Sequence, residues 1–132
     1  MSYPVQIARF ADERETREVF LLDHGEDGAA IIQYCWGELT QLSYGCAAIC
    51  QQLSIGKPAL ALLAGQMGWA DGVRAGLERL FADGDIMLSD LLDICESAAL
   101  PCRFCVTGSD GASIGSSWAA CERRRAGFSL VP

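Results

Sequence analysis

The pattern that most constrains the fold is an alternation of β-rich and helical stretches in the middle of the chain. "AAIIQYCW", residues 29–36, is a β-rich run. Residues 37–56 follow with apolar side chains in helical spacing, at Leu39, Leu42, Cys46, Ile49, Cys50 and Leu53. Gly56 stands where a helix stop is expected, and residues 58–64 read as a short apolar strand. Two parallel strands joined by a crossover helix are the unit of α/β proteins, so this is the predicted class.

The second half of the sequence continues the alternation. Asp71 is a predicted cap for a helix over residues 72–84, and Ser89 for one over 90–100. "CRFCV", residues 102–106, then reads as a strand. We therefore expect a compact α/β sandwich with a mostly parallel sheet flanked by helices. The sheet should contain segments near 30–36, 58–64 and 102–106, the last two of them parallel.

Both ends of the chain add predicted elements to this unit. "VQIARF" near the N-terminus alternates like a strand, and residues 18–36 predict a β-hairpin around "HGEDG". The tail predicts a short helix beginning near Ser116 and ending at Arg123–Arg125, then a last extended segment. At 132 residues, one domain over 1–132 is expected, with 1–28 as an N-terminal extension.

The composition of the chain limits which kinds of partner and which cellular compartment we expect. The formal net charge of −7 argues against nucleic-acid binding, because that affinity comes largely from Lys and Arg on phosphates. No apolar run approaches the ~18 residues of a membrane helix, and the N-terminus lacks the order of a signal peptide. We expect a cytoplasmic protein with no membrane or nucleic-acid partner. Its seven cysteines, an odd number, are then mostly free thiols rather than a disulfide framework.

"PCRFCVTGSDG", residues 101–111, places two cysteines three residues apart. Side chains alternate along a strand, so Cys102 and Cys105 should point to opposite faces and should not form a disulfide with each other. A redox role for the pair requires the strand prediction to be wrong. A structural zinc site needs more ligands than this pair and His24 provide, and the acidic loop around His24 is more typical of a solvated turn. No metal and no cofactor are predicted.

Cys105 has the most favourable predicted position among the cysteines. In open parallel sheets, reacting groups gather beyond the carboxyl ends of the strands, and Cys105 lies near such an end. The backbone N–H groups of the following loop, together with the predicted helix start near Ser116, would stabilise a thiolate or persulfide. The alternative is a Cys105 packed as a core thiol under the loop. The predicted loop residues of the site are Thr107, Gly108, Ser109, Asp110 and Gly111.

The order of these elements resembles the DsrE/DsrF-like family of small sulfur-relay proteins, which includes the Tus-type subunits. The likeness covers about residues 30–115 and includes "DGV" at 71–73 and "SDLLDICESAAL" at 89–100. The resemblance implies a compact parallel α/β sandwich that assembles into homo- or hetero-oligomers. It also implies that Cys105 carries sulfur as a persulfide, while Asp71 and Gly72 shape the neighbouring loop.

Two hypotheses for function follow. In the first, the protein is a sulfur carrier, and Cys105 accepts sulfane sulfur from a donor and passes it to the thiol of a partner protein. In the second, it is a non-catalytic binding module, such as an adaptor, an immunity-type protein or a regulatory subunit, that recognises its partner with an acidic surface. Both hypotheses predict a protein partner or a homo-oligomer, and an exposed strand edge offers one route to pairing.

Overall fold

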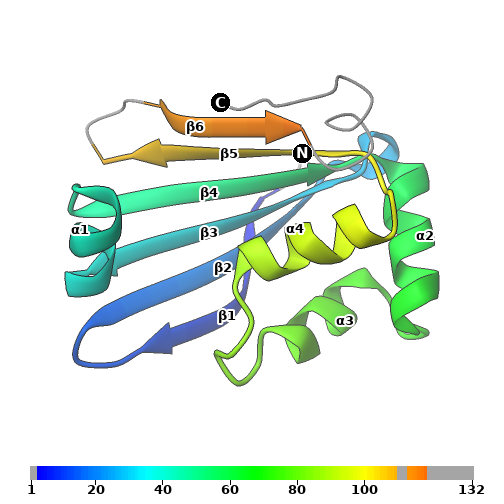
Figure 1. Cartoon of the computed structure of the whole chain (residues 1–132). Coiled ribbons are helices and arrows are strands. Elements are labelled where there is room, and N and C mark those ends of the chain that lie inside the picture. The colour runs from blue at the N-terminus through cyan, green and yellow to red at the C-terminus, as the bar shows by residue number, and fades with distance from the viewer. Residues whose placement is uncertain (1–2, 110–112, 119–132) are drawn as a thin grey trace.

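A computed structural model describes residues 3–109 and 113–118 of the chain. Its centre is a six-stranded sheet in which every strand pairs antiparallel with its neighbours, in the order of the sequence (Figure 1). The strands are β1 (Val5–Ala11), β2 (Glu15–Asp23), β3 (Ala29–Gly37), β4 (Ala48–Ile55), β5 (Cys102–Gly108) and β6 (Ser113–Trp118).

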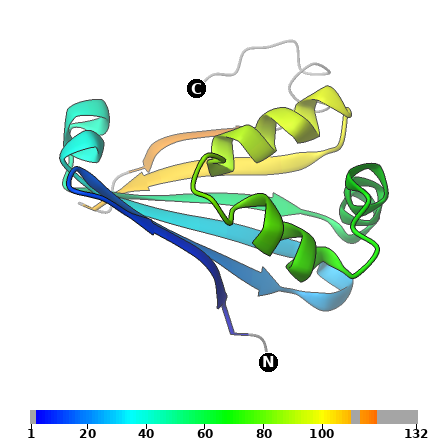
Figure 2. The same cartoon turned by 90° about the horizontal axis from the view of Figure 1, so that it is seen from below.

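The helices form a second layer on one side of this sheet. A short 3-10 turn, η1 (Gly25–Asp27), joins β2 to β3, and α1 (Glu38–Tyr44) joins β3 to β4. Between β4 and β5 the chain forms α2 (Lys57–Met67), α3 (Val73–Leu80) and α4 (Leu88–Ser97). Figure 2 shows these last three helices on the same side of the sheet. The result is a two-layer α/β arrangement whose other sheet face carries no described helix.

The prediction of a mostly parallel sheet is wrong, because residues 58–64 lie in α2 and not in a strand. Gly56 precedes α2 in an extended conformation, and Pro58 occupies its first turn, where the missing N–H costs no helical hydrogen bond. Gly68 ends the helix in the left-handed conformation, with φ of 72°. The apolar run was read as a strand because a short run of this kind has no periodicity that separates strand from helix.

The predicted helix over residues 37–56 is also wrong. It ends at Tyr44, where Gly45 adopts a left-handed φ of 74°, and the rest of the segment forms β4. Along β4 buried and half-buried residues alternate, with Ile49, Gln51, Leu53 and Ile55 buried. Ile49 and Leu53 are four residues apart, a spacing that suits one helix face and one strand face equally well. Cys46 and Cys50 therefore do not share a helix face.

Several other predictions are confirmed. The hairpin through residues 18–36 is formed by β2 and β3, with Leu22 opposite Ala30 and Phe20 opposite Ile32. The predicted strand at 102–106 lies within β5, and the two predicted helices exist as α3 and α4. Their caps differ from the prediction, being Gly72 and Met87. In the tail, residues 116–118 belong to β6 and not to a helix, while Arg123–Arg125 lie outside the described residues.

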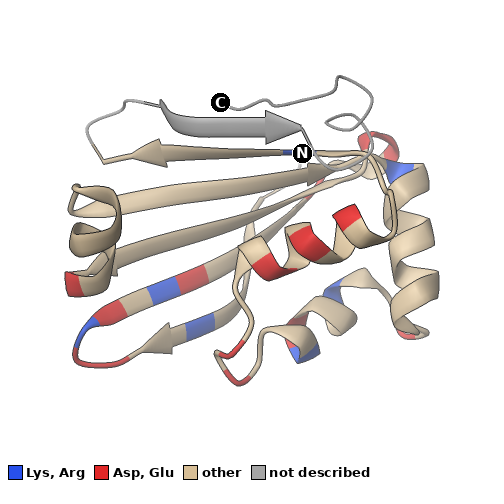
Figure 3. Cartoon of the chain, in the orientation of Figure 1, with Lys and Arg blue, Asp and Glu red and all other residues tan. Residues whose placement is uncertain are grey.

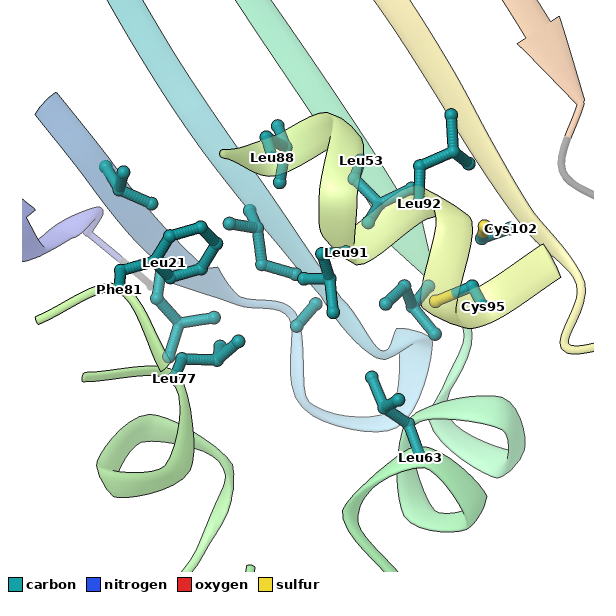
Figure 4. Packing of buried hydrophobic residues seen from close by; sticks show 14 of the residues in the cluster. Leu21, Leu53, Leu63, Leu77, Phe81, Leu88, Leu91, Leu92, Cys95 and Cys102 are labelled. Atoms are coloured by element: carbon teal, nitrogen blue, oxygen red, sulfur yellow. The ribbon is translucent and has the colours of Figure 1, made fainter. Parts of the chain in front are cut away.

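The hydrophobic core fills the space between the helical layer and the sheet (Figure 4). Leu77 of α3 and Leu88 and Leu91 of α4 are fully buried. They meet inward-facing strand residues that are also buried, including Leu21, Ile31, Leu53 and Ile55. Burying each leucine contributes roughly 2 kcal/mol, so this contact fixes where the helices sit on the sheet.

Candidate functional site

The predicted Cys105 site lies on a different part of the fold from the one expected. Cys105 is in the middle of β5, opposite Gln52 of β4 and Ser116 of β6. It is half-buried and projects from the sheet face that the helices do not cover, as does Thr107. Because β5 is antiparallel to both neighbours and Ser116 is in a strand, neither a parallel carboxyl edge nor a helix start lies beside Cys105.

The remaining predicted site residues are not gathered around this thiol. Gly108 ends β5. The backbone N–H of Ser109 donates to the carbonyl of Ala48 at 2.9 Å, so this N–H is already used in a hydrogen bond to β4. Asp110 and Gly111 lie outside the described residues.

Asp71 and Gly72 precede α3 in the helical layer, on the other side of the sheet from Cys105. The Asp71 carboxylate accepts two hydrogen bonds from the Arg79 guanidinium, at 2.6 and 3.0 Å. These bonds lower the pKa of Asp71 and raise that of Arg79. The pair therefore stabilises the turn into α3.

The thiols divide between the two sheet faces. Cys102 is 5% exposed in the core, whereas Cys105 faces the other way, and both are free, as predicted from their spacing. A hydrogen bond from Cys102 is the main reason why the pKa of Cys95 is lowered, but Cys95 is fully buried. Burial raises the pKa of Cys35 to about 11, which makes it a weak nucleophile. Burial, and then the nearby Cys105, raise the pKa of Cys50.

The loop around His24 borders a cavity of about 370 Å³ at one end of the sheet. Its lining includes His24, Asp27, Ser54, Cys102 and Arg103. Across residues 3–109 and 113–118, no group of three or more His, Cys, Asp or Glu side chains is placed to hold a metal ion.

The most distinctive electrostatic feature is an acidic surface on α4 and the loop that precedes it. Residues 81–101 contain five acidic side chains and no Lys, Arg or His: Asp83, Asp85, Asp90, Asp93 and Glu96. The last three recur at i, i+3 and i+6, so they share one side of α4. Figure 3 shows this segment with acidic bands alone. Glu96 is half-buried and its Oε2 is fully buried, so we call the other four residues, Asp83, Asp85, Asp90 and Asp93, the α4 acidic surface.

Most Lys and Arg side chains of the described residues pair with carboxylates outside this surface. Six of them form ion pairs, namely Arg9–Glu18, Arg14–Glu38, Arg17–Glu15, Lys57–Glu26, Arg74–Glu78 and Arg79–Asp71. None of these six pairs uses a carboxylate of the α4 acidic surface. The α4 acidic surface is therefore one region in which negative charge gathers, and Asp12, Glu13, Asp23 and Asp27, which these pairs do not use either, lie around the two ends of β2.

A groove runs beside this surface, between α4 and α2. It has a volume of about 430 Å³ and is lined by Asp93, Ile94, Ser97 and Ala98 of α4 and by Gln66 of α2. Leu62, one helical turn before Gln66, is 60% exposed. An acidic rim thus borders a shallow groove with apolar side chains.

The sequence contained part of this surface but not the groove. The three-residue spacing of Asp90 and Asp93, on the side of α4 away from the buried Leu91 and Cys95, was the signal for an acidic helix face. The groove was missed because its other wall, α2, was predicted to be a strand.

No described helix is both long and apolar enough to span a membrane. Comparison with protein-family models, with curated proteins and with solved structures finds no match.

Proposed function

We propose that this protein is a non-catalytic binding module that recognises a basic partner segment with its α4 acidic surface. The observation that carries the proposal is a run of four carboxylates, Asp83, Asp85, Asp90 and Asp93, in a segment of sequence that contains no Lys, Arg or His and lies beside the α2–α4 groove. Complementary charge speeds encounter and selects partners, while an apolar groove supplies contact area.

The shape of the groove favours a helical partner. An amphipathic helix lays its apolar residues, spaced at i, i+3, i+4 and i+7, into a groove between two helices. Ile94 and Ala98 line the groove and offer small apolar contacts of this kind, and Leu62 is exposed one helical turn before Gln66 on α2. Lysine or arginine residues along the edges of the partner helix would then lie over Asp93 and over Asp83 and Asp85. The proposed partner is therefore a basic amphipathic helix of another protein.

A synthetic peptide of about 18 residues, with Leu along one helix face and Lys elsewhere, is a suitable probe. We compare the wild type with a triple variant, Asp83→Asn, Asp85→Asn and Asp93→Asn. A charge-matched control changes Glu13→Gln, Glu26→Gln and Asp27→Asn, which lie on other loops. Exposed ion pairs contribute ~0.2–1 kcal/mol each, so the first variant should bind the peptide roughly tenfold more weakly. The control should bind within about twofold, because its charges lie elsewhere. Equal losses in both variants would show attraction to net charge alone and would contradict the proposal.

A second candidate function is sulfur carriage by Cys105. The observation that favours it is that Cys105 is half-buried and lies near Cys50 on the same face of the sheet. Cys105 would accept sulfane sulfur as a persulfide and pass it to a thiol of a partner protein. The test is incubation with a sulfane-sulfur donor followed by intact-mass analysis of wild type and Cys105→Ser. Loading in the wild type alone supports this candidate, and equal loading or none contradicts it.

A further inference from the structure

The uncovered face of the sheet has the composition of an interface. An antiparallel sheet covered on one side normally alternates apolar residues inward with polar residues outward. β3 does not alternate in this way, because it is apolar on both sides over most of its length. Ala29, Ile31 and Cys35 face the helices, whereas Ala30, Ile32, Tyr34 and Trp36 lie on the uncovered face, where Ala30 and Ile32 are buried and Tyr34 and Trp36 are exposed.

Large side chains from neighbouring strands extend this apolar stripe. Tyr34 is 42% exposed and Trp36 39% exposed. Phe20 of β2 meets Tyr34 edge to face, with ring centroids 5.7 Å apart, and Leu22 lies two residues further along β2. We call the set the β3 patch, which consists of Phe20, Leu22, Ile32, Tyr34, Trp36, Cys50 and Cys105. Thr16, Gln52, Ser54 and Thr107 surround it, so an aromatic centre has a polar rim, as protein interfaces do.

This face is nearly free of charge, although the protein as a whole is strongly acidic. Among the described residues of β1–β5, only Arg9, Glu18 and Arg103 are charged side chains that project from it. Arg9 and Glu18 neutralise each other at 3.1 Å. A second copy of the same chain therefore meets no strong repulsion here.

The α4 acidic surface lies in the opposite layer, so two copies packed sheet to sheet keep their acidic surfaces apart. Packed sheets are ~10 Å apart and a helix is about 10 Å across, which separates the two acidic surfaces by roughly 30 Å. This exceeds the Debye length of ~8 Å at physiological salt.

The patch is also complementary to itself. Trp36 lies beside the small Ala48 in the register of β3 and β4, and Tyr34 lies beside Cys50. Each large ring therefore has a smaller side chain next to it, and a two-fold axis through the patch would bring the rings of one copy over the smaller side chains of the other. We infer that the β3 patch is the interface of a homodimer in which two copies of the chain pack sheet against sheet.

The area is sufficient for a modest dimer. The five strands β1–β5, spaced ~4.8 Å apart and each ~25 Å long, give a face of roughly 600 Å² per copy. Two copies would bury roughly 1,200 Å², at the lower end of the range for stable interfaces. The dimer should therefore dissociate on dilution. Dimerisation would also cover Cys50 and Cys105, so only the monomer could load sulfur on Cys105.

Sedimentation velocity of the full chain over a range of concentrations tests the inference. We expect the wild type to shift from monomer to dimer as concentration rises. Trp36→Asp should remain monomeric with an unchanged circular dichroism spectrum, because it places a charge within the contact. The matched control is Leu42→Asp, since Leu42 is 70% exposed on α1 in the other layer. This control should dimerise like the wild type.

A second measurement on the wild type needs no substitution. Alkylation of Cys50 and Cys105 should slow several-fold as concentration rises, whereas Cys46, which is half-buried beside α1, should react at a constant rate. A wild type that stays monomeric at every concentration would overturn the inference. A dimer that survives Trp36→Asp, or alkylation rates at Cys50 and Cys105 that do not depend on concentration, would overturn it as well. Peptide binding at α4 does not depend on any of these outcomes.

Discussion

The buried side chain of Gln33 holds the first turn of α4 against the sheet through the backbone of Leu88. Its Oε1 accepts a hydrogen bond from the Leu88 N–H at 3.1 Å, while its Nε2 donates to Gln51 Oε1 at 2.6 Å. Gln33 and Leu88 are both fully buried. A helix begins with N–H groups that lack intrahelical partners, and here a sheet side chain satisfies one of them. The position of the α4 acidic surface therefore depends on an amide in β3.

Replacing Gln33 by Leu should lower the free energy of unfolding by about 2–4 kcal/mol, because it leaves the Leu88 N–H and the Gln51 Oε1 buried without their partner. Urea unfolding measures this loss. The matched control is Gln52→Leu, since Gln52 is half-buried and its amide reaches only Ser54, at 3.3 Å. The control should stay within about 0.5 kcal/mol of the wild type. Equal effects would show that the Gln33 network contributes no more than a surface hydrogen bond.

Arg17 provides a second test, because its charge is buried on the helical side of β2. The guanidinium lies 5.0 Å from the centre of the Phe10 ring, pairs with Glu15 at 3.5 Å and donates to the carbonyl of Gly84. Arg17→Met should cost about 3 kcal/mol, because it leaves Glu15 unpaired in a partly buried site. Arg9→Met, which breaks the more exposed pair with Glu18, should cost no more than about 1 kcal/mol. A smaller loss for Arg17→Met than for Arg9→Met contradicts this account.

Stability should fall at alkaline pH because of Cys35. Its folded-state pKa of about 11 lies above the ordinary thiol value, so the folded protein holds this proton more tightly than the unfolded chain does. The contribution is fully present below about pH 9 and is lost as the pH rises toward about 11, at up to ~1.4 kcal/mol per pH unit. Cys35→Ala should flatten this part of a urea-unfolding series. The control is Val106→Ala, which opens a cavity in the same cluster but removes no titrating group. It should lower the free energy of unfolding equally at every pH. Parallel curves for wild type and Cys35→Ala would refute the assignment.

Two glycines in neighbouring helices should respond in opposite ways to alanine. A Cβ on Gly76 of α3 would come within 2.2 Å of the Trp69 ring, so Gly76→Ala should destabilise the fold by about 1–3 kcal/mol. A Cβ on Gly65 of α2 meets nothing within 4 Å. Gly65→Ala should therefore stabilise the fold by about 0.5–1 kcal/mol, through helix propensity. Thermal unfolding of the two variants gives the comparison, and a stable Gly76→Ala would show that Trp69 can move aside.

The parts of the fold that could be predicted are those whose sequence fits only one periodicity, either that of a helix or that of a strand. The β2–β3 hairpin combines β-rich runs with a turn cluster, and α4 is long enough for its 3.6-residue spacing to be unambiguous. β4 could not be separated from a helix, because Ile49 and Leu53 satisfy both periods. α2 was misread because "ALALLAG" is apolar on every side. Once both were misassigned, a parallel sheet followed as a consequence.

The candidate surfaces were less predictable, because each depends on how elements pack together. The carboxylates of α4 are visible in the sequence, but the groove beside them exists only if α2 is a helix next to α4. The apolar run of β3 indicates a strand covered on both faces. Which face the helices leave open is decided by their connections and not by the strand itself. The Cys105 site depended on a parallel carboxyl edge, which an antiparallel β5 does not provide.

Amide hydrogen exchange of the full chain, with and without the Leu/Lys peptide, tests the central claim most directly. The account predicts slower exchange in α4 and along the side of α2 that carries Leu62 and Gln66, because the peptide would lie in the groove between these helices. Exchange in β3 should not change, since the β3 patch belongs to the other layer. Protection confined to β3, or the absence of any change at saturating peptide, would contradict the proposal that the α4 acidic surface is the recognition site.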